Sequence, residues 1–540
     1  MSAVEIGPPP AASAPPGAFA PLRQRLFAVL WLATVLGNIG SFMRDVASAW
    51  LVTDLSPSPF AVSAIQAAGT LPAFLLAIPA GALSDILDRR HLLIGILAFL
   101  AGVSSLLSLL AATGQASVES LVALTFLGGI GAALAAPSWQ AIVPELVPRS
   151  DLKAAVGLNS LGFNIARAIG PAVGGLLVAV VGASVTYLFD VGSDLVVIAA
   201  LLWWKRRTAP SDGLREHLGG ALRAALRYAR ASATLRSVLL RSAIFFLCAS
   251  AIWALLPIVA RRELGGGPGL YGLLLGGVGL GAIFGAVLMP RLRAGLGQDG
   301  LLTAALGLMA AVIAFMAIVN AAAAALPAAL VLGICWIVVL TTLNGTVQAI
   351  LPDWVRGRGL AVYLTVQGGA MTVGSLFWGA CAGRIGVPST LLAAAGVLAL
   401  VAAVTAFRRL ALPAGEADLT PSGHWAEPEV ATAPEHDRGP VMVSVTYRIP
   451  AERRGPFLAA LARFGEERRR DGAYAWGVAE DAADPERIVE WFFVESWAEH
   501  LRQHRRVSKA DADVQAELLG YHVGEAAPEV THLLGLSLPR

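Results

Sequence analysis

Twelve apolar segments dominate the sequence, and each is about as long as the roughly 20 residues that an α-helix needs to cross a membrane. Hydrophobic residues make up 56% of the 540 and charged residues only 14%, whereas soluble proteins carry about 45–50% and about 25%. This pattern excludes a purely soluble enzyme and a single-pass anchor, and it predicts an all-α membrane body. The predicted spans are residues 26–53, 60–83, 91–112, 118–143, 154–180, 184–204, 236–260, 270–290, 300–319, 324–350, 359–381 and 388–407.

Charge is distributed unevenly along the chain. Residues 1–407 carry a net charge of +9 and residues 408–540 a net charge of −6, so a soluble tail is expected to follow the membrane body. The overall charge of +3 gives no indication of nucleic-acid binding. An odd number of cysteines, all within apolar segments, argues against a disulfide framework or a cysteine-based zinc site. These are Cys248, Cys335 and Cys381.

Basic residues in the short loops predict the orientation in the membrane. They follow every second span, and they also precede the first, whereas the opposite loops contain only Arg261, Arg262 and Arg384. Both termini and the central loop, 205–235, are therefore predicted to be cytoplasmic. Residues 1–21 are rich in Pro and Ala and lack the charged region of a signal peptide, which predicts a disordered cytosolic tail.

An internal repeat divides the membrane body into two halves, 22–204 and 236–407. The sequence from Gln140 to Glu145 recurs from Gln348 to Asp353 at an offset of 208 residues. Other matching residues after the second and eighth spans recur at an offset of 204. Two parallel six-helix halves follow, an arrangement that many secondary transporters use, with the substrate site between the halves.

The loop after the second span contains the pattern Gly-x-x-x-Asp-x-x-x-Arg-Arg. This pattern resembles the signature loop of the major facilitator superfamily (MFS), and the resemblance implies a latch that stabilises one access state. Asp85 is expected to accept hydrogen bonds from a helix in the other half, and Arg89 to pair across the cytosolic seam. The alternative is that the two arginines only set orientation. The predicted latch residues are Gly81, Asp85, Asp88, Arg89 and Arg90.

The fifth span contains Gly170-Pro171-Ala-Val-Gly174-Gly175. This element resembles the one that marks the antiporter branch of the superfamily. Its small residues allow close helix contact, and the proline bends the helix; ordinary helix packing is the competing interpretation. Many proton-coupled members carry an Arg in the fourth span, four residues before a Gly-x-Gly, but this chain has Thr125 at that position.

Among the few charged residues inside the predicted spans, five are of interest for coupling: Arg44, Asp45, Arg167, Asp190 and Asp194. A central charge in a membrane costs at least about 2.5–3.5 kcal/mol, so it usually faces a partner or a wet cavity. All five are candidates for proton coupling, with Asp45 as the first candidate for the carrier. Structural ion pairs, such as one between Arg167 and Asp194 or between Asp45 and an arginine, are the alternative.

Residues 26–407 resemble the enterobactin-exporter and macrolide-efflux branch of the superfamily. The segments that carry the likeness are Met43–Leu51, Leu71–Pro72 and Pro79–Gly81. The resemblance implies a multi-pass protein of the inner (plasma) membrane that exports a siderophore or a hydrophobic, drug-like molecule in exchange for protons. An importer or facilitator remains the alternative.

A linker, 408–439, leads to a soluble domain, 440–540, that reads as βαββαβ. Strands are predicted at 441–447, 476–480, 487–495 and 528–535, and helices at 453–470 and 497–504. This order suggests a ferredoxin-like fold. The domain also resembles cofactor-free monooxygenase-like domains that dimerise through their sheets. The resemblance implies that a second copy of the chain is a partner, in a homodimer through the C-terminal domain.

Histidines in the tail raise the question of a metal site. His500 and His504 are one helical turn apart, a spacing that binds metals, and Glu499, His522 and His532 are nearby in the sequence. Because the spacing fixes no third ligand, the sequence predicts no metal, no cofactor and no catalytic residue, and favours a regulatory or dimerising surface. A tail enzyme that modifies the transported molecule is the alternative.

Overall fold

The computed structural model describes residues 17–204, 226–230, 232–407, 422 and 438–536. Most of the predicted N-terminal tail, 1–21, the central loop, 205–235, and the linker, 408–439, lies outside the described residues. The chain divides into two compact units. One comprises residues 1–211, 246–339 and 368–403, and the other comprises 212–245, 340–367 and 404–540.

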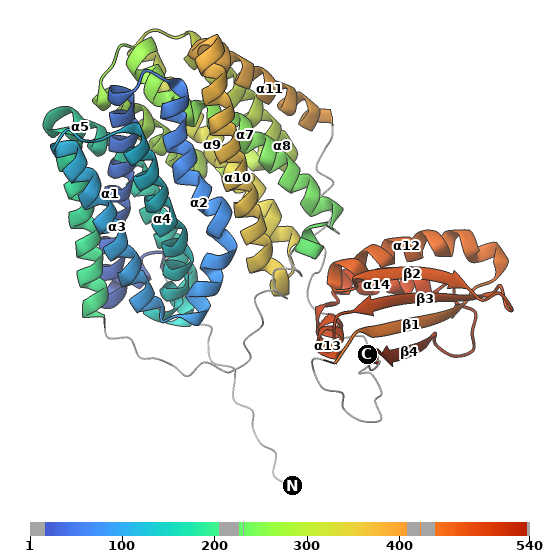
Figure 1. Cartoon of the computed structure of the whole chain (residues 1–540). Helices are drawn as coiled ribbons and strands as arrows, with labels where there is room; N and C mark the ends of the chain where they lie inside the picture. The colour runs from blue at the N-terminus through green and yellow to red at the C-terminus, as the bar shows by residue number, and fades with distance from the viewer. Residues whose placement is uncertain (1–16, 205–225, 231, 408–421, 423–437, 537–540) are drawn as a thin grey trace. The chain divides into compact units, whose positions relative to one another are not determined.

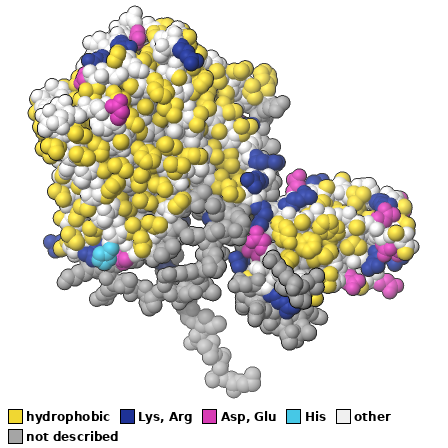
Figure 2. Space-filling model, in the orientation of Figure 1, with side chains coloured by type: hydrophobic (Ala, Val, Ile, Leu, Met, Phe, Trp, Pro, Cys, Tyr) yellow, Lys and Arg dark blue, Asp and Glu magenta, His cyan; other side chains and the backbone are white. Residues whose placement is uncertain are grey.

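The membrane body consists of long helices (Figure 1). Within the described residues, ten helices are long and apolar enough to cross a membrane. Hydrophobic side chains cover most of the visible surface of these helices, as expected for contact with lipid (Figure 2). The helices are α1 (Arg25–Leu55), α2 (Pro59–Ile86), α3 (Arg89–Ala112), α4 (Val118–Leu146), α5 (Leu152–Trp203), α7 (Ala233–Ile258), α8 (Pro268–Ile318), α9 (Ala322–Ile350), α10 (Asp353–Ile385) and α11 (Val387–Phe407).

Two of these helices are each double spans. α5 has 52 residues and α8 has 51, which at 1.5 Å per residue is more than twice the roughly 30 Å of hydrocarbon. Each contains one glycine with a positive φ, 86° at Gly182 and 68° at Gly297, a conformation that glycine adopts without steric penalty. Counting both parts of each, the described residues contain the twelve predicted spans.

The break at Gly182 reverses the chain. Before it, Gly174 packs so closely on Met43 of α1 that a Cβ at Gly174 would lie 2.8 Å from the Met43 Cα. After it, Asp190 contacts the adjacent Arg44. Both parts of α5 therefore pack along α1, and they run in opposite directions. As a result, Arg44 and Asp190 lie at the same depth in the membrane body.

The tail contains a four-stranded antiparallel sheet in the order β2-β3-β1-β4, which confirms the predicted ferredoxin-like topology. Alternate β1 side chains, including Val443 and Val445, are buried against the helices, so the helices cover one face of the sheet. A further helix, α14, is absent from the sequence prediction. The elements are β1 (Val441–Arg448), α12 (Arg454–Asp471), β2 (Ala475–Glu480), β3 (Arg487–Val494), α13 (Trp497–Arg506), α14 (Lys509–Leu519) and β4 (Glu529–Leu534).

A buried carboxylate connects three elements of the tail. Glu490 on β3 is fully buried, and it accepts hydrogen bonds from Arg468 Nε (3.2 Å) and Trp476 Nε1 (3.0 Å). Tyr447 on β1 donates a third bond to the same carboxylate. These hydrogen bonds compensate the Glu490 carboxylate for the loss of water, and a buried charge is tolerated only with such compensation.

We therefore predict that Glu490→Ala destabilises the tail by about 3–5 kcal/mol, because it leaves the Arg468 guanidinium buried without its carboxylate. Hydrogen exchange of β1 and β3 in the purified full-length protein measures this. Glu480→Ala is the matched control, because Glu480 forms an exposed pair with Arg454 and such pairs contribute about 0–1 kcal/mol. Equal protection in both variants would contradict the prediction.

Candidate functional site

A cavity of about 340 Å³ lies in the membrane body, and its wall is formed by α1, α2, α3, α4, α5, α7 and α8. Its wall is mainly apolar and aromatic, with a few polar groups, which is the usual make-up of a small-molecule site. All of its lining residues belong to one compact unit. The polar and aromatic ones include Phe42, Arg44, Asp45, Gln66, Thr125, Phe163, Arg167, Trp253 and Tyr271.

Arg44 and Asp190 form a buried ion pair beside this cavity. The Arg44 Nη1 donates to Asp190 Oδ2 at 3.0 Å, and the side chains are 8% and 0% exposed. Ser104 from α3 donates to the same carboxylate oxygen at 2.7 Å. A Cβ at Gly40 would lie 2.8 Å from Asp190 Oδ1, so the glycine allows α1 to approach the pair closely.

Asp45 differs from Asp190 in its surroundings. Its side chain is 61% exposed and lines the cavity. Its Oδ1 accepts a long bond of 3.5 Å from Arg44 Nη2. The same guanidinium thus contacts one buried carboxylate and one accessible carboxylate, so a change of charge at Asp45 acts directly on the Arg44–Asp190 pair.

The predicted pair between Arg167 and Asp194 does not form. The Arg167 guanidinium instead lies over the rings of Trp253 and Trp336, 5.7 and 5.8 Å from their centroids, an arrangement that stabilises a cation. Asp194 is 2% exposed, is absent from the cavity wall, and has one oxygen without a hydrogen-bond partner among the described residues. No local pattern indicated the two tryptophans as partners, because they lie in distant spans.

The glycines of the Gly-Pro element pack α5 against two helices. A Cβ at Gly170 would lie 2.7 Å from the Phe42 Cβ on α1. A Cβ at Gly175 would lie 2.7 Å from the Cα of Gly272 on α8. Pro171 lines the cavity. The element therefore joins the two halves and holds α1, with its charged residues, at the cavity wall.

The halves also meet through charged side chains that the sequence analysis did not assign. Arg261 donates to Asp54 and to Thr53, and Arg262 donates to the Pro57 carbonyl. The Arg261 guanidinium also lies 5.6 Å from the ring centroid of Trp50. These contacts join the last turn of α1 and the residues just after it to the π-helical turn Val259–Glu263 that follows α7. The sequence contained an indication of these contacts, because Arg261 and Arg262 lie in a connection of the kind that otherwise has few basic residues.

Three of the predicted latch residues form contacts within the first half. Asp88 caps α3 by accepting from the His91 backbone N–H. Arg89 donates to the Ala141 carbonyl and to Glu145, each at 3.2 Å. Arg90 donates to the carbonyls of Leu201 and Leu202. The other two, Gly81 and Asp85, lie near the end of α2, and their side chains lie outside the described part of the structure.

The sequence profile of a protein family described as "transmembrane secretion effector" matches residues 16–539, which include both the membrane body and the tail. The chain belongs to this family. It is one of the MFS transporter families, which confirms the superfamily inferred from the loop after the second span.

Named relatives of this family member are exporters and transporters. The chain is 27% identical over 411 residues to the multidrug efflux pump Tap of Mycolicibacterium fortuitum, covering 71% of this chain and 96% of that protein. It is 23% identical over 256 residues to the staphyloferrin A transporter of Staphylococcus aureus, covering 47% of this chain and 64% of that protein. The chain thus matches slightly less than two thirds of the second relative.

Solved structures show the same fold at low sequence identity. A bacterial homologue of the human lysosomal transporter Spinster, in an inward-facing and occupied conformation, superposes with a TM-score of 0.56 and 16% identity. The match covers 72% of this chain and 97% of that structure. The membrane body therefore has the fold of a secondary transporter and is an integral membrane structure.

We predict that Asp190→Ala destabilises the membrane body by about 3–5 kcal/mol, because Arg44 loses its buried partner. The thermal unfolding midpoint of the purified protein in detergent is the measurement. Asp45→Ala serves as the control and is expected to change the midpoint little, since the Asp45 carboxylate is exposed to the cavity. Similar losses in both variants would show that the two carboxylates are not separated into a buried and an accessible role.

Proposed function

We propose that this protein exports a small hydrophobic, siderophore-like or drug-like molecule by alternating access, in exchange for protons. The observation that carries the proposal is the cavity, in which the accessible carboxylate of Asp45 lies beside the buried Arg44–Asp190 pair. An exchangeable proton and a substrate would then occupy one space. The efflux-named relatives support the export direction.

The ligand class follows from the cavity wall. Phe42, Phe163, Trp253 and Tyr271 offer aromatic surface for an apolar body. Arg167 offers a positive charge at the same wall, and among the described residues no acidic side chain pairs with it. These features favour a ligand with an apolar or aromatic part and an anionic group.

The shared guanidinium supports proton coupling. When Asp45 is ionised, Arg44 is divided between two carboxylates; when Asp45 is protonated, Arg44 is left to Asp190 alone. A change of access state that moves α1 relative to α5 would alter the 3.5 Å contact between Arg44 and Asp45 and so couple proton release to movement.

The fourth helix receives a cation from its neighbour. Thr125 replaces the arginine that many proton-coupled members carry in this span, yet the Arg44 guanidinium lies against the same helix. A Cβ at Gly128, one turn beyond Thr125, would lie 3.8 Å from the central carbon of that guanidinium. Arg44 of α1 would therefore supply the positive charge that α4 lacks.

The placement in the cell belongs to the same proposal. The basic loops support a position in the plasma (inner) membrane with both termini cytoplasmic. Two six-helix halves, 22–204 and 236–407, would carry transport, and the domain 440–540 would serve them without enzymatic activity. The uncovered face of its sheet carries Trp491 and Phe493, whose ring centroids are 6.0 Å apart, and the half-exposed Leu533. This apolar face supports a homodimer through the sheet.

A comparison of metabolites between deletion and wild-type cells tests the direction and reveals the ligand. An exported compound accumulates inside deletion cells, whereas loss of an importer depletes it. Turnover of that compound by the full-length protein, with a new product formed, would instead support an enzyme that modifies the transported molecule.

Asp45→Asn is expected to abolish transport driven by a pH gradient and to spare substrate binding, because the amide keeps the shape but carries no proton. Transport into vesicles and ligand binding to purified protein are the two measurements. Glu119→Gln is the control, because Glu119 lies exposed in the first turn of α4 and does not line the cavity. Gradient-driven transport at the wild-type rate would remove Asp45 as the carrier and make Asp194 the next candidate.

For the latch, Asp85→Asn is expected to slow transport several-fold while expression stays near wild type, because the change affects the balance of access states and removes no packing. The transport rate of reconstituted protein, normalised to the amount inserted, is the measurement. Transport at the wild-type rate would show that this loop only sets orientation.

A further inference from the structure

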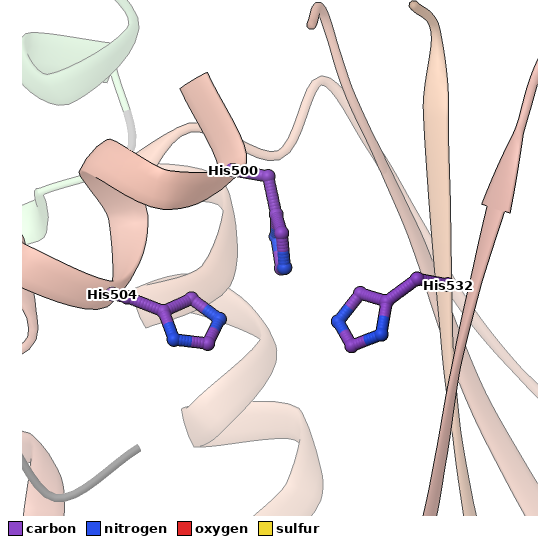
Figure 3. A group of neighbouring side chains, drawn as sticks. All are labelled: His500, His504 and His532. Atoms are coloured by element: carbon purple, nitrogen blue, oxygen red, sulfur yellow. The ribbon is translucent and has the colours of Figure 1, made fainter. Parts of the chain in front are cut away.

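Three histidines converge in the tail, at the end of the sheet where α13 crosses it (Figure 3). His500 and His504 lie one turn apart on α13, and His532 lies on β4 opposite Val443 of β1. One ring nitrogen from each side chain lies within 4.8 Å of the others. The ring centroids of His504 and His532 are each 4.7 Å from that of His500. Figure 3 shows the three rings turned toward a common space.

The central histidine is incompletely hydrogen-bonded, and the side chain that acts on it as a hydrogen-bonding neighbour is Gln503 on the same helix. His500 is 1% exposed, and neither of its ring nitrogens has a hydrogen bond of regular geometry among the described residues. Buried polar side chains are nearly always hydrogen-bonded, and an unsatisfied one costs about 1–3 kcal/mol. One nitrogen of this imidazole lies toward the other two rings and is available to a ligand, while Gln503 can serve the other.

The surroundings favour neutral imidazoles, the form that binds metal ions. Burial, with smaller contributions from His504 and His532, lowers the pKa of His500 to about 3. Burial also lowers the pKa of His504, to about 4. Arg468, a cation whose charge acts on both histidines, is paired with Glu490 at 3.2 Å, so its charge is largely compensated.

We propose that His500, His504 and His532 form a binding site for a divalent transition-metal ion, with Zn²⁺ as the expected ion. Three imidazole nitrogens are the ligand set of open zinc sites, in which a water or an exchangeable ligand occupies the fourth position. Nitrogen donors alone select against Mg²⁺ and Ca²⁺, which require oxygen.

The geometry is close to that of a bound ion. Zn–N distances of about 2.0–2.1 Å in a tetrahedron place the nitrogens about 3.4 Å apart, against an upper separation of 4.8 Å here. His504 and His532 are half-buried, and binding of an ion would require their side chains to draw in by the difference. The sequence predicts no metal because it places no third ligand beside α13; the fold places His532 there.

Metal binding to the purified full-length protein, with any affinity tag removed, tests the site. After chelation and dialysis, we expect one Zn²⁺ per chain, and Co²⁺ is expected to give the ligand-field absorption of a tetrahedral complex. His504→Ala and His532→Ala are each expected to weaken binding by more than the about 10–100-fold that changes around metal ligands cause.

His522→Ala is the matched control, because His522 lies in the same domain but contacts Arg448 and Ala526. It is expected to keep wild-type affinity. Hydrogen exchange of β1 and β3 verifies that each variant keeps its fold. Wild-type affinity in His532→Ala, or Zn²⁺ binding to the wild type no tighter than to a variant lacking all three histidines, would overturn the proposal. So would Mg²⁺ competing equally with Zn²⁺.

Discussion

The absence of water from the hydrocarbon core is the constraint on which the membrane body depends. Backbone groups there must be satisfied within the chain, which leaves helices as the available structure. Side-chain charges must find a partner or a wet cavity. Arg44 and Asp190 are buried and are each other's partner, whereas the carboxylate of Asp45 is accessible from the cavity. Because one guanidinium contacts both acids, the structural role and the proposed coupling role would meet at a single side chain.

Close backbone contact is the second requirement of the site. Gly175 and Gly272 allow α5 and α8 to touch across the two halves, and Arg261 and Asp54 join the halves at a loop. The first contact depends on having no side chain, so it tolerates no added atom. The second depends on an exposed ion pair, which is weak and breaks readily. A transporter needs both kinds, since its halves must stay together while they move.

The tail follows different rules, because it is an α+β domain with a hydrophobic core of its own. Its helices and strands bury a conventional core, and its buried charge is satisfied in place by the bonds to Glu490. The region around α13 differs, because the His500 imidazole and the Gln503 amide are buried without hydrogen bonds of regular geometry among the described residues. Buried polar groups that lack hydrogen bonds, in a core where the other polar groups have them, are expected at functional sites. This supports the proposal that a ligand completes the site. A metal ion there would also tie α13 to the edge strand β4.

The sequence by itself determined the membrane class, the spans and the ferredoxin-like tail, because hydrophobic segment length and strand alternation are local properties. It missed α14, whose pattern is short and weakly apolar. It also identified the charged residues of the site and offered an arginine as a partner of Asp45, but it missed the pair between Arg44 and Asp190. The structure contains an Arg44–Asp190 pair and not the Arg167–Asp194 pair that the sequence suggested. The chain reversal at Gly182 decides this, because it sets the depth at which the second part of α5 packs on α1. The third histidine was likewise decided by strand order, since β4 pairs with β1 and so reaches α13. Contacts between distant segments depend on how helices and strands pack, and no local pattern encodes that packing.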